Sequence, residues 1–163
     1  MRAWQRNFPW SEKRIWASKS SRSKSPSTLR SSRAHRNLGQ IYFSIGKLPE
    51  AIAELETMHR LDGNGTYGLE ALGFIHARAG RTNEAQKLLR QLLELQRQGL
   101  DYRVGIALVQ QALGDDGLAL DSLDMAFAER AFGLERLNAD PYWNCLRPNA
   151  RVQAILRKMN LMK

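Results

Sequence analysis

The same residue types recur at a fixed step of 34 positions through the middle of this chain. Glycine stands at positions 46, 80 and 114. The same step relates three alanines and three leucines, namely Ala51, Ala85 and Ala119, and Leu55, Leu89 and Leu123. A period of roughly 20–50 residues is typical of a solenoid of stacked units rather than a compact enzyme core. Because solenoids present extended surfaces to partners, the period favours binding over catalysis.

Each unit carries two amphipathic helical patterns, one on either side of the repeated glycine. In the first unit the apolar residues before the glycine are Leu38, Ile41, Tyr42 and Ile45, and those after it are Ile52, Leu55, Met58 and Leu61. Spacings of three and four residues predict helices. The repeated glycine is predicted to end the first helix, because glycine adopts a left-handed conformation without a steric clash. Small residues at positions 39, 73 and 107 predict close contact between the helices of a pair.

These residues resemble the tetratricopeptide repeat (TPR), a 34-residue unit with Leu-Gly, an aromatic residue three positions on, then Gly and Ala. The resemblance is closest over residues 36–58, good over 70–92 and looser over 105–126. It implies an all-α fold, a TPR-type αα-superhelix with three helix-turn-helix repeats at about residues 34–62, 66–97 and 100–130.

Residues 131–163 are expected to form a turn region and a C-terminal capping helix. Asp140-Pro141 and Arg147-Pro148 predict turns. The stripe of the final helix comprises Val152, Ile155, Leu156 and Met159. Such a helix would cover the exposed face of the third unit, as solenoids require. This segment resembles the tail that follows the last repeat in bacterial signalling and regulatory proteins containing TPR regions.

The positive charge is concentrated at the N-terminus. The whole chain carries +9, and residues 1–33 hold nine basic residues and one acidic residue, a net charge of +8. The remaining residues hold sixteen basic and fifteen acidic residues, so they are nearly neutral. Because residues 18–32 are mostly Ser, Lys and Arg, we expect residues 1–33 to form a basic, disordered arm. Five large apolar residues at positions 4, 8, 10, 15 and 16 leave open whether part of the arm covers the first helix.

The sequence offers no pattern that predicts an enzyme, a cofactor or a metal site. His35, His59 and His76 have no ligand partners at metal-site spacing. The single cysteine, Cys145, is expected to be a packing residue, and its being alone favours a cytoplasmic setting. No secretory signal and no apolar run of about 20 residues is present, so no membrane span is expected.

The TPR resemblance implies a binding surface on the first helix of each pair, which lines a concave groove. The groove positions that it implies are Arg36, Asn37 and Gln40 in the first unit, Tyr67, Glu70, Phe74 and Arg78 in the second, and Asp101 and Leu108 in the third. Arg36 and Asn37 are suited to hold a carboxylate by charge-assisted hydrogen bonds. We therefore expect a non-catalytic scaffold or adaptor that binds a peptide or partner helix, with no small-molecule substrate.

Two other interpretations stay open at this point. The basic arm could bind nucleic acid or an anionic surface, with affinity that falls steeply as salt rises. The chain could also be a fragment of a larger TPR-containing regulator. That interpretation is motivated by the first helix, which would expose Leu38, Ile41 and Ile45 if nothing precedes it in the stack.

Overall fold

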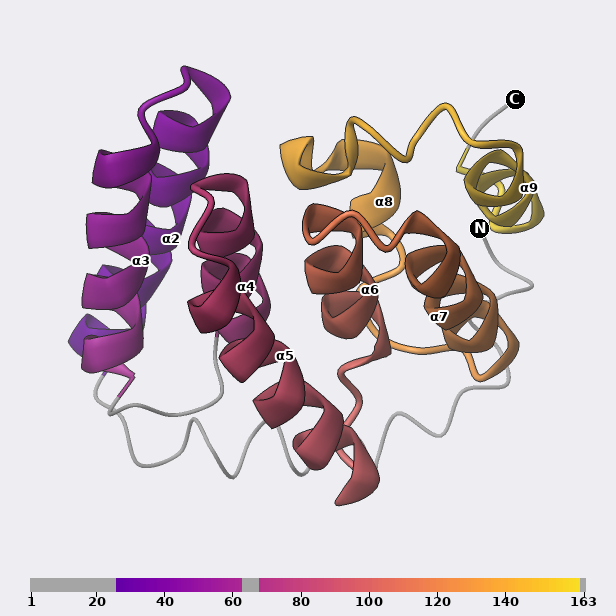
Figure 1. Cartoon of the computed structure of the whole chain (residues 1–163), viewed down its shortest axis with the longest axis horizontal. Coiled ribbons are helices and arrows are strands. Elements are labelled where there is room, and N and C mark those ends of the chain that lie inside the picture. Colours follow the sequence, from indigo (N-terminus) through magenta and orange to yellow (C-terminus); the bar gives the residue numbers. More distant parts are fainter. Residues whose placement is uncertain (1–25, 63–67, 162–163) are drawn as a thin grey trace.

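The chain is all-helical where its structure is described. The computed structural model describes residues 26–62 and 68–161, and these ranges hold eight α-helices, one 3-10 helix and no strand (Figure 1). The helices are α2 (Pro26–Ser44), α3 (Leu48–Leu61), α4 (Leu69–Arg78), α5 (Thr82–Arg97), α6 (Arg103–Ala112), α7 (Asp116–Ala128), α8 (Arg136–Ala139), the 3-10 helix η1 (Pro141–Trp143) and α9 (Ala150–Lys158). The predicted all-α class is confirmed.

The helices α2 to α7 form three consecutive pairs, each built from one of the sequence units. In Figure 1 the pairs α2–α3, α4–α5 and α6–α7 follow one another from left to right. Helix α4 packs on α3, and α6 packs on both α4 and α5, so neighbouring pairs stack on each other. One buried apolar cluster extends through all three pairs into the C-terminal region.

The first helix begins earlier than the composition indicated. Helix α2 starts at Pro26, so residues 26–33 belong to a helix although they were assigned to the basic arm. The rest of that expected arm, residues 1–25, lies outside the described residues. Leu38, Ile41 and Ile45 of α2 are exposed, and no described helix covers them.

The repeated glycines end the first helix of each pair, as predicted. Gly46, Gly80 and Gly114 have φ angles of +77°, +76° and +92°. In this left-handed region a Cβ atom would clash with the following carbonyl, which costs about 1–2 kcal/mol. The N–H of the next residue, Lys47 in the first unit, donates to the carbonyl of Tyr42 at 2.8 Å and so satisfies a carbonyl at the helix end.

Gly39 and Gly73, which lie within helices α2 and α4, allow close packing, although not against the same neighbour. A Cβ atom added to Gly39 would lie 2.9 Å from Leu55 Cγ, in the second helix of the same pair. One added to Gly73 would lie 2.9 Å from Val109 Cγ2, in the next pair. The prediction of contact within a pair is therefore confirmed for Gly39, whereas the nearest contact of Gly73 is between pairs.

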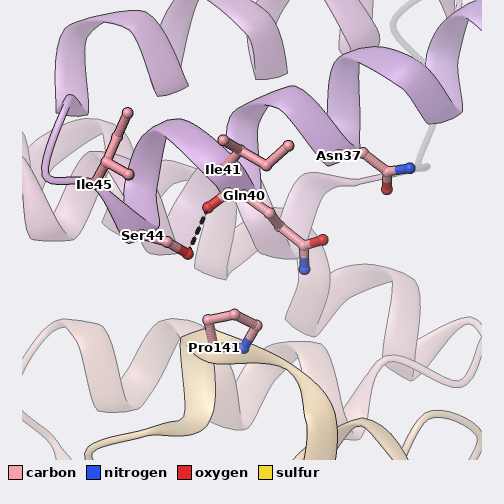
Figure 2. Close-up of a pocket in the computed structure, with 6 residues that line it drawn as sticks. All are labelled: Asn37, Gln40, Ile41, Ser44, Ile45 and Pro141. Atoms are coloured by element: carbon pink, nitrogen blue, oxygen red, sulfur yellow. Dashed lines mark hydrogen bonds between the residues drawn. The ribbon is translucent and has the colours of Figure 1, made fainter.

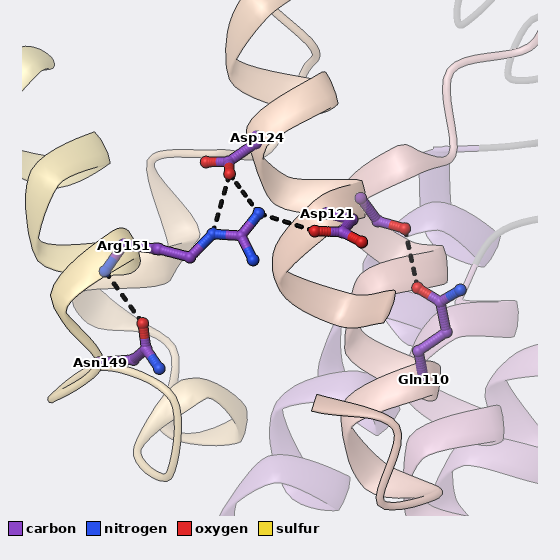
Figure 3. A network of polar contacts seen from close by, with 6 residues as sticks. Gln110, Asp121, Asp124, Asn149 and Arg151 are labelled. Atoms are coloured by element: carbon purple, nitrogen blue, oxygen red, sulfur yellow. Dashed lines mark hydrogen bonds and ion pairs between the residues drawn. The ribbon is translucent and has the colours of Figure 1, made fainter. Parts of the chain in front are cut away.

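The last helix covers the third pair, as expected of a cap. Val152, Ile155 and Leu156 of α9 are buried, and α9 packs on α7. The guanidinium of Arg151 donates to Asp121 at 2.7 Å and also to Asp124, both on α7 (Figure 3). The side chain of Asn149 accepts a hydrogen bond from the N–H of Arg151, which caps the start of α9.

Candidate protein-binding groove

The C-terminal turn region folds back onto the first helices of units one and two. Tyr142, in η1, is buried against two phenylalanines from different helices. Its ring centroid lies 5.1 Å from that of Phe43 in α2 and 4.6 Å from that of Phe74 in α4. The two phenylalanine rings also meet each other edge-on at 5.1 Å. These distances fall in the range of favourable aromatic pairs, so the turn region is part of the core.

Ion pairs hold the same region in place. Arg136 Nη1 in α8 lies 3.4 Å from Glu70 Oε1 in α4. Arg36 Nη2 in α2 lies 4.0 Å from Asp140 Oδ2, at the start of η1. Arg147 donates to the carbonyls of Leu137 and Asp140, both at 3.0 Å. The inner faces of α2 and α4 are therefore bound to residues from the chain's own C-terminal region.

An open hollow remains between α2 and this turn region. It has a volume of about 470 Å³, and it is lined by Asn37, Gln40, Ile41, Ser44, Ile45 and Pro141. Figure 2 shows Gln40 and Ser44 on the side of α2 that faces Pro141. The Ser44 hydroxyl donates to the Gln40 carbonyl at 2.9 Å. The hollow therefore combines two amide side chains with an apolar wall formed by two isoleucines and a proline.

The predicted groove residues of the first unit gather at this hollow. Asn37 and Gln40 line it. Arg36 lies one residue before Asn37 and is paired with the carboxylate of Asp140 in the same chain. Tyr67, the first groove position predicted in the second unit, lies outside the described residues.

The remaining predicted positions lie away from the hollow. Phe74 and Leu108 are only 1% and 2% exposed and belong to one buried cluster with Tyr142. Glu70 is paired with Arg136, and Asp101 accepts a hydrogen bond from the backbone N–H of Phe132 at 2.8 Å. Arg78 is exposed at the end of α4. Of the predicted groove positions that the structure describes, Asn37 and Gln40 are the two that line the hollow.

Four residues of the hollow were absent from the predicted groove. Ile41 and Ile45 were identified in the sequence as parts of a helical stripe, and Pro141 as part of a turn. Ser44 carries no pattern that distinguishes it from other polar helix residues. The Asp-Pro-Tyr-Trp sequence at 140–143 was the available signal, because burial of two large aromatic side chains is strongly favourable.

His35, His76 and Cys145 lie outside the hollow. No group of three or more His, Cys, Asp or Glu side chains is placed there to hold a metal ion. His35 Nδ1 lies 2.5 Å from Glu54 Oε2 and ties α2 to α3. His76 is buried, and desolvation lowers its pKa. Cys145 is exposed, so the prediction that it is a packing residue is wrong: it lies just beyond η1, whose Trp143 takes the buried place.

Burial also changes the acidity of the tyrosine at the centre of the turn region. Desolvation, with a smaller contribution from the Asp140 carboxylate, raises the pKa of Tyr142 well above its ordinary value of 10.0. Its hydroxyl has no hydrogen-bond partner among the described residues. Tyr142 therefore stays neutral and serves as an apolar ring.

Among the described helices, none has both the length and the apolar character needed to cross a bilayer. Comparison with protein-family models, with curated proteins and with solved structures finds no match to this chain.

Proposed function

We propose that the protein is a non-catalytic interaction module of the TPR type, a scaffold or adaptor that binds a protein partner in the hollow between α2 and Pro141. The observation that carries the proposal is the hollow itself, where predicted groove residues Asn37 and Gln40 lie beside Ile41 and Ile45. Interfaces commonly join an apolar centre to a rim of polar groups that fix orientation.

The repeat architecture supports the same conclusion. Three helical pairs follow the 34-residue period, their first helices end at left-handed glycines, and a C-terminal helix covers the last pair. These features are typical of TPR superhelices, whose first helices present the binding surface. We also propose a cytoplasmic setting, which the single cysteine of the sequence fits.

Affinity capture from host lysate with a matched pair of variants tests the proposal. Gln40→Arg places a long charged side chain in the hollow, whereas Gln91→Arg makes the same change at an exposed position of α5. A discrete protein should be retained by the intact chain and by Gln91→Arg, and its affinity for Gln40→Arg should be weaker by about tenfold or more. Equal retention by both variants would contradict the proposed site.

The basic N-terminal region supplies a second candidate function. Its net charge of +8 over residues 1–33 favours binding to nucleic acid or another anionic surface. Such binding would fall steeply with salt concentration and would be lost from a chain that begins at Pro26, where α2 starts. Binding of a partner in the hollow should persist at raised salt concentration and in the chain that begins at Pro26.

A further inference from the structure

The first helix exposes residues whose equivalents are covered in the next two units. Leu38, Ile41 and Ile45 of α2 are 40%, 56% and 61% exposed. The equivalent residues 34 positions later, in the second unit, are Leu72, Ile75 and Ala79. Those in the third unit are Ile106, Val109 and Leu113. Of these six equivalents, all but Ala79 and Leu113 are buried, and those two are partly buried. The stripe on α2 is therefore a stacking face that no described helix covers.

The third unit shows which kind of group covers this face. Ile106 and Val109 are buried in a cluster with Leu92, against which Leu88 and Leu95 also pack. These three leucines lie on α5 at spacings of four and three residues, which places them on one side of the helix. Leu69 of α4 belongs to the same cluster, and Val109 also lies against Gly73 of α4, so α4 and α5 cover this face together. The part of the cover that α5 supplies is an amphipathic helix with apolar side chains at positions i, i+4 and i+7.

We propose that Leu38, Ile41 and Ile45 bind an amphipathic helix of a partner protein that presents apolar side chains at positions i, i+4 and i+7. The inference rests on the proposed function, because Ile41 and Ile45 also line the hollow. The stacking interface between pairs continues onto α2 with the same residue types at the same positions. Docking of a helix by its apolar face into a groove is a common recognition mode.

A peptide with the sequence of α5, residues 82–97, is a suitable probe, because this helix already covers part of the equivalent face in the third unit. The isotope-labelled full chain would be titrated with it and followed by NMR. Saturable shift changes are expected at residues 38–45. A control peptide with Leu88, Leu92 and Leu95 replaced by Gln should cause none. Shift changes confined to α6 would mean that the peptide displaces α5, and would overturn the proposal.

A matched pair of protein variants separates specific binding from general hydrophobic contact. Ile41→Asp introduces a charge into the stripe, and Leu118→Asp makes the same change on α7 at a side chain that is also 56% exposed. Peptide affinity should fall by about tenfold or more for Ile41→Asp and stay unchanged for Leu118→Asp. Equal effects of the two variants would overturn the proposal.

Three further results would assign the face differently and so overturn the proposal. Tighter peptide binding after combined replacement of Trp4, Trp10 and Trp16 by Ser would assign the face to the chain's own N-terminal region. A dimer of the full chain that Ile41→Asp dissociates would assign the face to a second copy. A natural partner that is lost with Gln40→Arg but kept with Ile41→Asp would preserve the proposed function and refute only the helix-binding face.

Discussion

Removal of the Tyr142 ring should destabilise the whole helical stack. The side chain is 1% exposed and contacts Phe43 and Phe74, which belong to helices of two different pairs. Replacement of a buried aromatic residue by alanine costs about 3–5 kcal/mol. Part of this loss of stability comes from the two aromatic contacts, each of which contributes about 0.5–1.5 kcal/mol. We therefore expect Tyr142→Ala to lower the free energy of unfolding by about 3–5 kcal/mol.

The conservative variant Tyr142→Phe should behave differently. It keeps the ring and removes a hydroxyl that has no hydrogen-bond partner among the described residues. A buried polar group without a partner costs about 1–3 kcal/mol of desolvation, so its removal is neutral or stabilising. The free energy of unfolding should stay equal to that of the parent chain or rise by up to about 1 kcal/mol.

Urea denaturation followed by far-ultraviolet circular dichroism measures both effects, since that signal reports all helices together. For a chain of this size, 3–5 kcal/mol corresponds to a decrease in Tm of about 6–20 °C. Leu118→Ala, at an exposed position of α7, is the control and should change stability by less than about 0.5 kcal/mol. A loss below about 1 kcal/mol for Tyr142→Ala would refute the conclusion that the C-terminal turn region belongs to the core.

Two further predictions concern a tight helix contact and a buried histidine. Gly73→Ala should destabilise the chain by about 1–3 kcal/mol, because the new Cβ would meet the stiff side chain of Val109 at 2.9 Å. Gly117→Ala, where the new Cβ has no atom within 4 Å, should instead stabilise the chain by about 0.4–1 kcal/mol. If urea denaturation shows that both variants change the free energy of unfolding in the same direction, this reasoning is contradicted. Burial lowers the pKa of His76 from its ordinary value of 6.5, so the unfolded chain takes up the proton first as pH falls. The stabilisation from neutral His76 is therefore fully present above pH 6.5, the ordinary pKa of histidine. It is lost as the pH falls from 6.5 toward the lower pKa of the folded chain. Thermal unfolding at several pH values should show a smaller loss of Tm on acidification for His76→Gln than for the parent chain, and identical pH profiles would count against this role.

The helical pairs could be predicted from the sequence because their signals are local. Apolar spacing of three and four residues specifies which face of a helix is buried, and this holds for Leu55 in α3 and for Val152 in α9. Gly46 was identified as a helix end because its positive φ angle is a property of one residue. The expected exposure of Leu38, Ile41 and Ile45 is also found in the structure.

The open part of the groove was decided only by the tertiary structure. Residues 131–149 have no repeat period, so their path across α2 and α4 could not be read from spacing. Tyr142 lies 68 positions from Phe74 in the sequence, yet the two rings are in contact. That contact buries Phe74, which the repeat pattern had placed in the groove, and leaves Asn37 and Gln40 facing Pro141. A helical repeat specifies which positions face inward, whereas the path of the non-repeating segment determines which of them remain open to a partner.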